Sequence, residues 1–247
     1  RWTTIDPVAP GYRSWSPYHY TLNNPLKYVD PDGAIIEFAD TGAEKLYNYI
    51  YEHASDDMRS MFDKLDGSDV VYTIGLVSEG GDELRGAIGN TSLAHYDDED
   101  GFTAVNIFIT NGNRDEDARY QIGALADELT HASQFEDGEI GYDGNRGENA
   151  IAYDYDDEVE SRVNAVNATD RCECEAAADN AMIADPSISK EDKVNLLDSR
   201  GYRFNSIDNK EKVVDVISDP AKVQKLKNSG VNRVIYRDNG KTKHKDL

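Results

Sequence analysis

The sequence is short of cysteine, of positive charge and of long apolar runs. Two cysteines among 247 residues, Cys172 and Cys174, exclude a fold held together by a framework of disulfides. Lys and Arg number 26 against 48 Asp and Glu, a formal net charge of −22. This balance disfavours a general nucleic-acid binder, because phosphates must be met by clustered Lys and Arg. No apolar run reaches about 18 residues, so we expect no membrane span.

The chain nevertheless has the apolar content of a folded protein. Hydrophobic residues make up 38% of it, and apolar runs recur, such as VVYTI at 70–74 and VNIFI at 105–109. A chain of this length can bury a sizeable core in one domain with appendages. Because the first residue is Arg1 rather than Met, we expect the chain to be a piece of a longer protein.

Proline and charge divide the chain into three parts. Five of the seven prolines and both tryptophans fall within residues 1–33, where we expect an extended, turning segment and no helix. Residues 210–247 carry ten Lys and Arg against five Asp and Glu, which leaves −27 for residues 34–209. The last part therefore forms a basic tail, for which we expect short helices, a strand and exposure to solvent. The alternative is that the tail binds an acidic partner, such as the middle of this same chain.

Apolar periodicity predicts long helices beside a small sheet. Helical spacing predicts helices over 43–65, 115–136 and 155–184, and a shorter helix after the candidate N-cap Ser189. Strand-like runs between turn-rich breaks lie at 69–76, 84–93, 102–110 and 233–236. This order indicates an α+β fold, with long helices packed beside a small, mostly antiparallel sheet.

The opening segment contains a specific succession of short sequence motifs. It contains RWTTIDP at 1–7, YRSWSPYHY at 12–20, NNP at 23–25 and YVDPDG at 28–33. This succession resembles the conserved end of the core of Rhs/YD-repeat proteins. The resemblance implies that residues after 33 form the variable C-terminal domain, in that family usually a toxin delivered to a neighbouring cell by a secreted or cell-surface protein. It also implies two protein partners, the β-cage of the parent chain and a cognate immunity protein.

A second resemblance lies in the predicted helix 115–136, in the segment ADELTHASQF at 126–135. This segment is similar to the zincin-like metallopeptidase toxin domains found after Rhs cores, whose motif is His-Glu-x-x-His. In that motif, histidines one turn apart reach one zinc ion and the intervening Glu is the general base. Here Asp127 replaces the first His, Glu128 matches the base and His131 matches the second ligand. The resemblance thus implies zinc, or another divalent metal, held less tightly, and weak peptide hydrolysis.

The helical spacing of the same segment gives a second observation, which does not depend on the resemblance. One face presents polar and small residues, and the opposite face presents Ile122, Leu125 and Leu129. The polar face comprises Tyr120, Gly123, Ala124, Asp127, His131 and Gln134. Two small residues one turn before Asp127 would let another backbone or a ligand approach closely. An ordinary solvated surface would show the same pattern.

A third metal ligand is expected from the next predicted helix. Its sequence YDDEVES at 155–161 is similar to the Asp-Glu-Val-Glu-Ala stretch that follows the metal motif in related Rhs toxin domains. Glu158 and Glu160 flank Val159 by about 100° on either side, so the spacing does not choose between them. We favour Glu158 as the ligand and keep Glu160 as the alternative. We expect Val159, with Val163 and Val166, to mark the packed stripe. An acidic helix N-terminus favoured by the helix dipole would look the same.

The remaining candidates are weaker. His95 is expected in a solvated turn at a strand end. The thiols of Cys172 and Cys174 would point about 200° apart on a helix, so neither metal chelation nor a disulfide is expected. The acidic segments 97–101 and 154–158 lack the spacing of an EF-hand and are interpreted as solvated loops.

These features predict an Rhs-associated effector domain over residues 34–209. Its function would be that of a zinc-dependent peptidase weakened at Asp127, acting on a peptide or protein. The strand over 103–110 would line the cleft and pair with an extended substrate. The alternative is a catalytically inactive pseudo-peptidase that uses the cleft for binding. A nuclease is disfavoured by the charge of −27 in this region.

Overall fold

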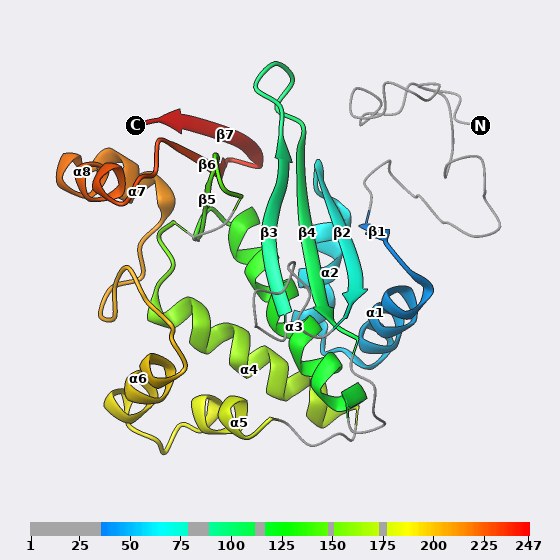
Figure 1. The fold of residues 1–247 in the computed structure, drawn as a ribbon. Helices are drawn as coiled ribbons and strands as arrows, with labels where there is room; N and C mark the ends of the chain where they lie inside the picture. The colour runs from blue at the N-terminus through cyan, green and yellow to red at the C-terminus, as the bar shows by residue number, and fades with distance from the viewer. Residues whose placement is uncertain (1–35, 79–88, 112–116, 148–150, 173–176) are drawn as a thin grey trace, which may run out of the picture.

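The computed structural model describes residues 36–78, 89–111, 117–147, 151–172 and 177–247 (Figure 1). The Rhs-like segment 1–33 lies outside these residues. The described helices are α1 (Thr41–His53), α2 (Asp56–Asp66), α3 (Asp117–Glu136), α4 (Tyr155–Arg171), α5 (Ala178–Ala184), α6 (Lys190–Ser199), α7 (Val213–Ser218) and α8 (Pro220–Asn228). The described strands are β1 (Ile36–Phe38), β2 (Val70–Val77), β3 (Gly89–Tyr96), β4 (Thr103–Thr110), β5 (Tyr142–Asp143), β6 (Arg233–Asp238) and β7 (Lys241–Asp246).

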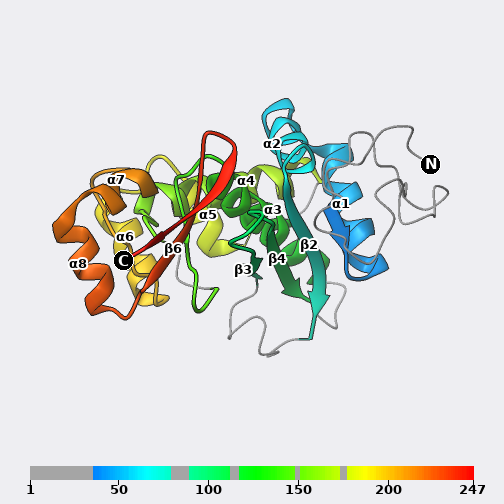
Figure 2. The same ribbon diagram turned by 90° about the horizontal axis from the view of Figure 1, so that it is seen from above.

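The main sheet has four strands in the order β1-β2-β4-β3. β1 pairs with β2, and β2 with β4, in the parallel sense, whereas β3 runs antiparallel to β4 at the edge. α3 contacts β3 and β4 on one face of the sheet, and α4 packs against α3 (Figures 1 and 2). α3 therefore lies next to the edge strand β3, and α4 packs in turn against α3.

The core lies between this sheet and the helices that cover it. Along β4 buried and half-buried residues alternate, and Val105, Ile107 and Ile109 face inward, as the period of two requires. On α3 the predicted apolar face is confirmed, because Ile122, Leu125 and Leu129 are buried in the same cluster. One face of α3 is thereby fixed against the sheet, and its polar face is turned toward α4.

Two of the predicted long helices are each interrupted. The helix expected over 43–65 ends at His53 and restarts at Asp56, because the Ser55 hydroxyl accepts a hydrogen bond from the Met58 N–H at 3.2 Å and caps a new helix. The helix expected over 155–184 ends at Arg171, and α5 begins only at Ala178. The cap predicted at Ser189 is confirmed by its bond from the Asp192 N–H at 3.1 Å.

The basic tail belongs to the folded body, so the expectation of a solvated tail is wrong. Its strands β6 and β7 form an antiparallel sheet with β5 of the middle region. Val234 and Ile235 are fully buried, and the Arg237 guanidinium is buried between the carboxylates of Glu136 and Asp69. Apolar burial and opposite charge together hold the tail against the acidic middle.

The element order confirms the α+β class. Antiparallel pairing joins β3 to β4 and the three strands β5, β6 and β7, while the two parallel pairings of the main sheet were not expected. Among the described helices, none has the length and apolar character needed to cross a lipid bilayer.

Candidate functional site

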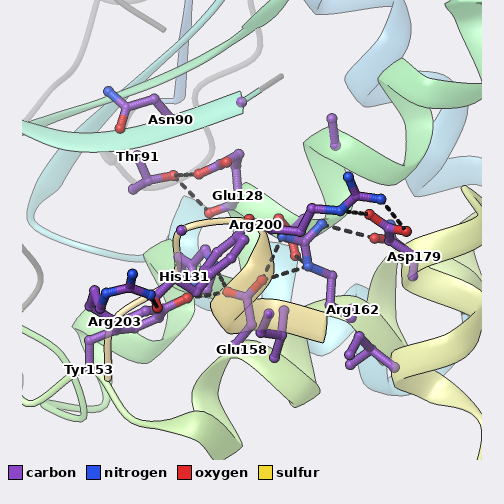
Figure 3. Close-up of a pocket in the computed structure, with 18 of the residues that line it drawn as sticks. Asn90, Thr91, Glu128, His131, Tyr153, Glu158, Arg162, Asp179, Arg200 and Arg203 are labelled. Carbon is purple, nitrogen blue, oxygen red and sulfur yellow. Dashed lines mark hydrogen bonds and ion pairs between the residues drawn. The ribbon is translucent and has the colours of Figure 1, made fainter. Parts of the chain in front are cut away.

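A cavity of about 1070 Å³ opens between β3, α3, α4 and the segment that follows α6. Its polar lining comes from elements far apart in the chain (Figure 3). β3 contributes Asn90 and Thr91, α3 contributes Asp127, Glu128 and His131, α4 contributes Glu158 and Arg162, and other segments contribute Tyr153, Asp179, Asn180, Arg200, Tyr202 and Arg203. The predicted residues Asp127, Glu128, His131 and Glu158 thus share one cavity.

Small residues bring α3 and α4 close together at this site. A Cβ atom added at Gly123 would lie 3.5 Å from the Thr169 side chain and 3.9 Å from that of Ala165. On α4 the buried stripe consists of polar and small residues, including Ser161 and Ala165. The expected valine stripe is confirmed only in part: Val159, Val163 and Val166 are half-buried, and Val159 packs against the cluster of Tyr155, Ile183 and Leu197. Close packing through small side chains lets the polar groups of both helices reach one space.

Glu158, and not Glu160, faces His131. Glu158 is fully buried, and its Oε2 lies 3.7 Å from the His131 Nε2 and accepts a hydrogen bond from the Tyr153 hydroxyl. The Glu160 carboxylate is half exposed and meets Lys210 at 3.3 Å outside the cavity. The interpretation of 154–158 as a solvated loop is wrong, since Glu158 and Asp157 are buried within α4.

Arg162 lies between the carboxylates of Glu158 and Asp127. Its role in the site was not predicted from the sequence. Its Nε lies 2.6 Å from Glu158 Oε1 and 3.7 Å from Asp127 Oδ1. Its other nitrogens donate to Asn180 Oδ1 at 2.8 Å and to the Tyr202 hydroxyl. The signal was available, because a Glu followed four residues later by Arg forms a favourable pair on a helix.

The ring of His131 is oriented by Gln134. The Gln134 amide nitrogen donates to the Asp157 carbonyl at 2.9 Å, so its oxygen accepts a hydrogen bond from the His131 Nδ1–H at 2.8 Å. This leaves Nε2 directed at Glu158. Burial lowers the pKa of His131, but the neighbouring carboxylates of Asp127 and Glu158 outweigh burial and raise the pKa above its ordinary value.

Glu128 is held against the edge strand. Its Oε2 accepts a hydrogen bond from the Thr91 hydroxyl at 2.7 Å. The β3 backbone lies so close that a Cβ atom at Gly89 would be 2.6 Å from Glu128 Oε1. Burial, together with the charge of Asp127, raises the pKa of Glu128 to about 7. Near neutral pH this carboxyl can therefore either give or take a proton.

The strand beside the site is β3, so the expectation that Thr103–Thr110 lines the cleft is wrong. That segment forms β4, which is paired with β2 on one side and with β3 on the other. A strand paired on both sides has no free edge for a substrate. β3 is the edge strand because of the order in which distant segments pair in the sheet. The local sequence pattern does not contain that order.

No model of a known protein family, no curated protein and no solved structure matches the chain. The function is therefore argued from the side chains of the cavity. The kinships suggested by residues 1–33 and 126–135 remain expectations.

The side chains expected to bind zinc do not form a zinc centre. His131 Nε2 and Glu158 Oε2, 3.7 Å apart, could share one ion, since zinc ligands lie about 2.0–2.2 Å from the metal. The Asp127 carboxylate, however, faces Arg162, whose guanidinium also binds Glu158. Within the described residues, no three His, Cys, Asp or Glu side chains converge to hold a metal ion. The donor set does not fit the three-ligand site that the motif implies.

The weaker candidates lie away from the cavity. His95 is exposed on β3, with its ring 5.9 Å from that of Phe102, and does not line the cavity. Cys172 is buried at the end of α4, while Cys174 lies outside the described residues. His95 and Cys172 therefore add no reactive group to the cavity.

Proposed function

We propose that this chain is the effector region of an Rhs-type protein and that its cavity is a peptidase-like site that binds an extended peptide. In this proposal the domain acts as a pseudo-peptidase. The observation that supports it most is the Arg162 guanidinium between Asp127 and Glu158. This cation already balances the two acids that a metal would need as ligands.

The edge of β3 supports a peptide as the ligand. The Leu93 N–H points away from β4 and donates to the Gly147 carbonyl at 2.9 Å. Backbone groups alternate along a strand, so the N–H and C=O of Thr91 and Gly89 point to the same outer edge. That edge borders the cavity. An extended peptide paired there would direct a side chain toward Glu128.

Zinc-dependent hydrolysis is the second candidate function. The observation that favours it is the orientation of His131, whose Nδ1–H is bound to Gln134 while Nε2 faces Glu158 at 3.7 Å. Metal-binding histidines are commonly oriented in this way by a second hydrogen bond. Under this function the wild-type chain binds zinc in a one-to-one ratio and cleaves the peptides that it selects.

Peptide selection and metal analysis test the proposal together. The chain is panned against a phage library of random peptides, and selected synthetic peptides are titrated and then checked for cleavage by mass spectrometry. We expect intact, bound peptides and no stoichiometric zinc in calorimetry with zinc chloride. Cleavage with one zinc per chain would establish the second candidate, and failure to select any peptide would refute the proposal.

A variant of the edge strand identifies the binding surface. Thr91→Pro removes the outward N–H, a position where an edge strand tolerates proline, and should abolish peptide binding. Thr91→Val is the matched control, because it removes the hydroxyl bonded to Glu128 but keeps the backbone donor. Equal binding by both variants would show that the peptide does not pair with β3.

A further inference from the structure

We propose that Arg162 is the resident cation of the site and that its removal alone converts Asp127, His131 and Glu158 into a divalent-metal site. This inference rests on the proposed function in one respect, that the wild-type chain holds no metal at these residues. It adds which single side chain prevents metal binding.

The position of Arg162 is the first argument. It lies one turn after Glu158 on α4, and its guanidinium contacts Glu158 Oε1 at 2.6 Å and Asp127 Oδ1 at 3.7 Å. Its side chain is only 17% exposed. Two buried carboxylates beside one imidazole need a positive charge nearby, and Arg162 supplies it. A second cation at this point would be repelled by the guanidinium.

Unused ligand capacity is the second argument. Asp127 Oδ1 is buried and has no hydrogen-bond partner among the described residues. His131 Nε2 and Glu158 Oε2 are separated by a distance that one metal ion can bridge. The Gln134 amide already holds His131 Nδ1, as an outer partner of a metal ligand does. Asp127 Oδ1 and Glu158 Oε1 thus face the guanidinium, His131 Nε2 faces the other oxygen of Glu158, and the cavity is open to supply water.

The other contacts of Arg162 are the third argument. The guanidinium donates to the neutral groups of Asn180 and Tyr202, which come from α5 and from the segment after α6. Both groups line the cavity, so water can replace the guanidinium as their partner. Removing Arg162 therefore leaves an uncompensated charge only on Asp127 and Glu158, and a divalent ion can balance that charge.

The test compares wild type with Arg162→Met, which keeps an unbranched apolar stem and removes the charge. Each purified chain is dialysed, its zinc is measured by mass spectrometry, and zinc chloride is titrated by calorimetry and in thermal unfolding. We expect about one zinc per chain in Arg162→Met, bound roughly 100-fold or more tightly than by wild type. Zinc should raise the Tm of the variant and leave that of wild type unchanged.

Matched variants locate the metal. Arg200→Met removes another arginine of the cavity, whose partner is Asp179 at 2.7 Å, and should bind no zinc. Arg162→Lys keeps a positive charge and should also bind none. Adding either Asp127→Asn or His131→Ala to Arg162→Met should abolish the zinc binding that Arg162→Met gained.

The outcomes separate this inference from the proposed function. A folded Arg162→Met that binds zinc no better than wild type overturns the inference, and so does a variant that fails to refold even with zinc, because the ion should replace the lost charge. Stoichiometric zinc in wild type, lost in His131→Ala, overturns both this inference and the proposed function. Zinc gained by Arg162→Met, with no peptide bound by wild type, supports the inference and refutes only the peptide ligand.

Discussion

Arg237, which is buried, and Arg162, which is half-buried, differ in how completely their carboxylate partners are paired. Arg237, 3% exposed, donates to Glu136 Oε2 at 2.9 Å, to Asp69, to Thr242 Oγ1 at 3.0 Å and to the Gly240 carbonyl at 3.0 Å. The other oxygen of Glu136 accepts from the hydroxyls of Ser68 and Tyr72. Both oxygens of Glu136 are thereby paired, and Arg237 does not line the cavity.

The carboxylates around Arg162 are paired less completely than Glu136. Arg162 binds Glu158 closely but reaches Asp127 only at 3.7 Å, and Asp127 Oδ1 lacks a hydrogen bond within the described chain. Arg162 also borders the cavity. A fully paired network stabilises a fold, whereas a buried network with an unused acceptor beside a cavity has the capacity to bind something else. The two arginines therefore differ in the pairing of their carboxylate partners as well as in burial.

Arg237→Met should give the largest loss of stability. It leaves Glu136 buried without its cation, which costs about 3–5 kcal/mol of unfolding free energy. Urea unfolding of Arg233→Met provides the control, because Arg233 lies on the same strand but forms exposed ion pairs with Asp98 and Asp246. Equal losses in the two variants would contradict the structural role of Arg237.

Gly89→Ala should disturb the cavity from the side of β3. Its new Cβ would lie 2.8 Å from Glu128 Cγ, so the side chain or the strand must move, at a cost of about 1–3 kcal/mol. Unfolding measurements on Gly89→Ala, Glu128→Ala and the double variant test this contact. The loss should shrink when Glu128 is already truncated, and strict additivity would exclude the clash.

Asp154 extends the comparison to a buried carboxyl with no arginine. Burial raises the pKa of Asp154 to about 6, although the Glu211 N–H donates to its Oδ2 at 2.7 Å. A pKa above the unfolded value means that stability falls as pH rises from about 4 to 6. Asp154→Asn should flatten that slope and stabilise the chain by about 1–2 kcal/mol at pH 7. Urea unfolding across this pH range would disprove the prediction if both slopes agree.

Asp127→Asn should have the smallest effect on stability. Because Asp127 Oδ1 makes no hydrogen bond in the described structure and lies 3.7 Å from Arg162, Asn removes no hydrogen bond at this oxygen, and we expect a change below about 1 kcal/mol. Glu136→Gln, at the fully paired site, should cost more, about 2 kcal/mol. Thermal unfolding of the two variants in parallel measures the difference, and the reverse order would invalidate the comparison.

Local patterns in the sequence predicted much of the fold. The apolar face of α3, the strand at β4 and the cap at Ser189 each depend on neighbouring residues, so local patterns and capping chemistry were sufficient. The break at Ser55 was missed because an apolar pattern at helical spacing continued through it. The position of β4 inside the sheet was missed because strand order is set by contacts between distant segments.

The candidate site was predicted in part for the same reason. The grouping of Asp127, His131 and Glu158 was expected from the resemblance of two segments to metallopeptidase toxin domains, and helical spacing placed Asp127 and His131 on one face. The pair of Arg162 with Glu158 could have been predicted from their spacing of four, but Asn180 and Tyr202, which complete its contacts, come from two later segments and have no spacing relation to it. Charge compensation inside a cavity is a property of the assembled fold.

The pairing of β6 with β5 has a consequence for biosynthesis. A ribosome releases the chain from its N-terminus, so the helix that carries Glu136 is complete long before Arg237 emerges. Until then the Glu136 carboxylate lacks its cation and β5 lacks its neighbouring strand. The nascent domain therefore cannot reach its final stability until β6 has been synthesised, and truncation before β6 should act as a folding defect of the whole body.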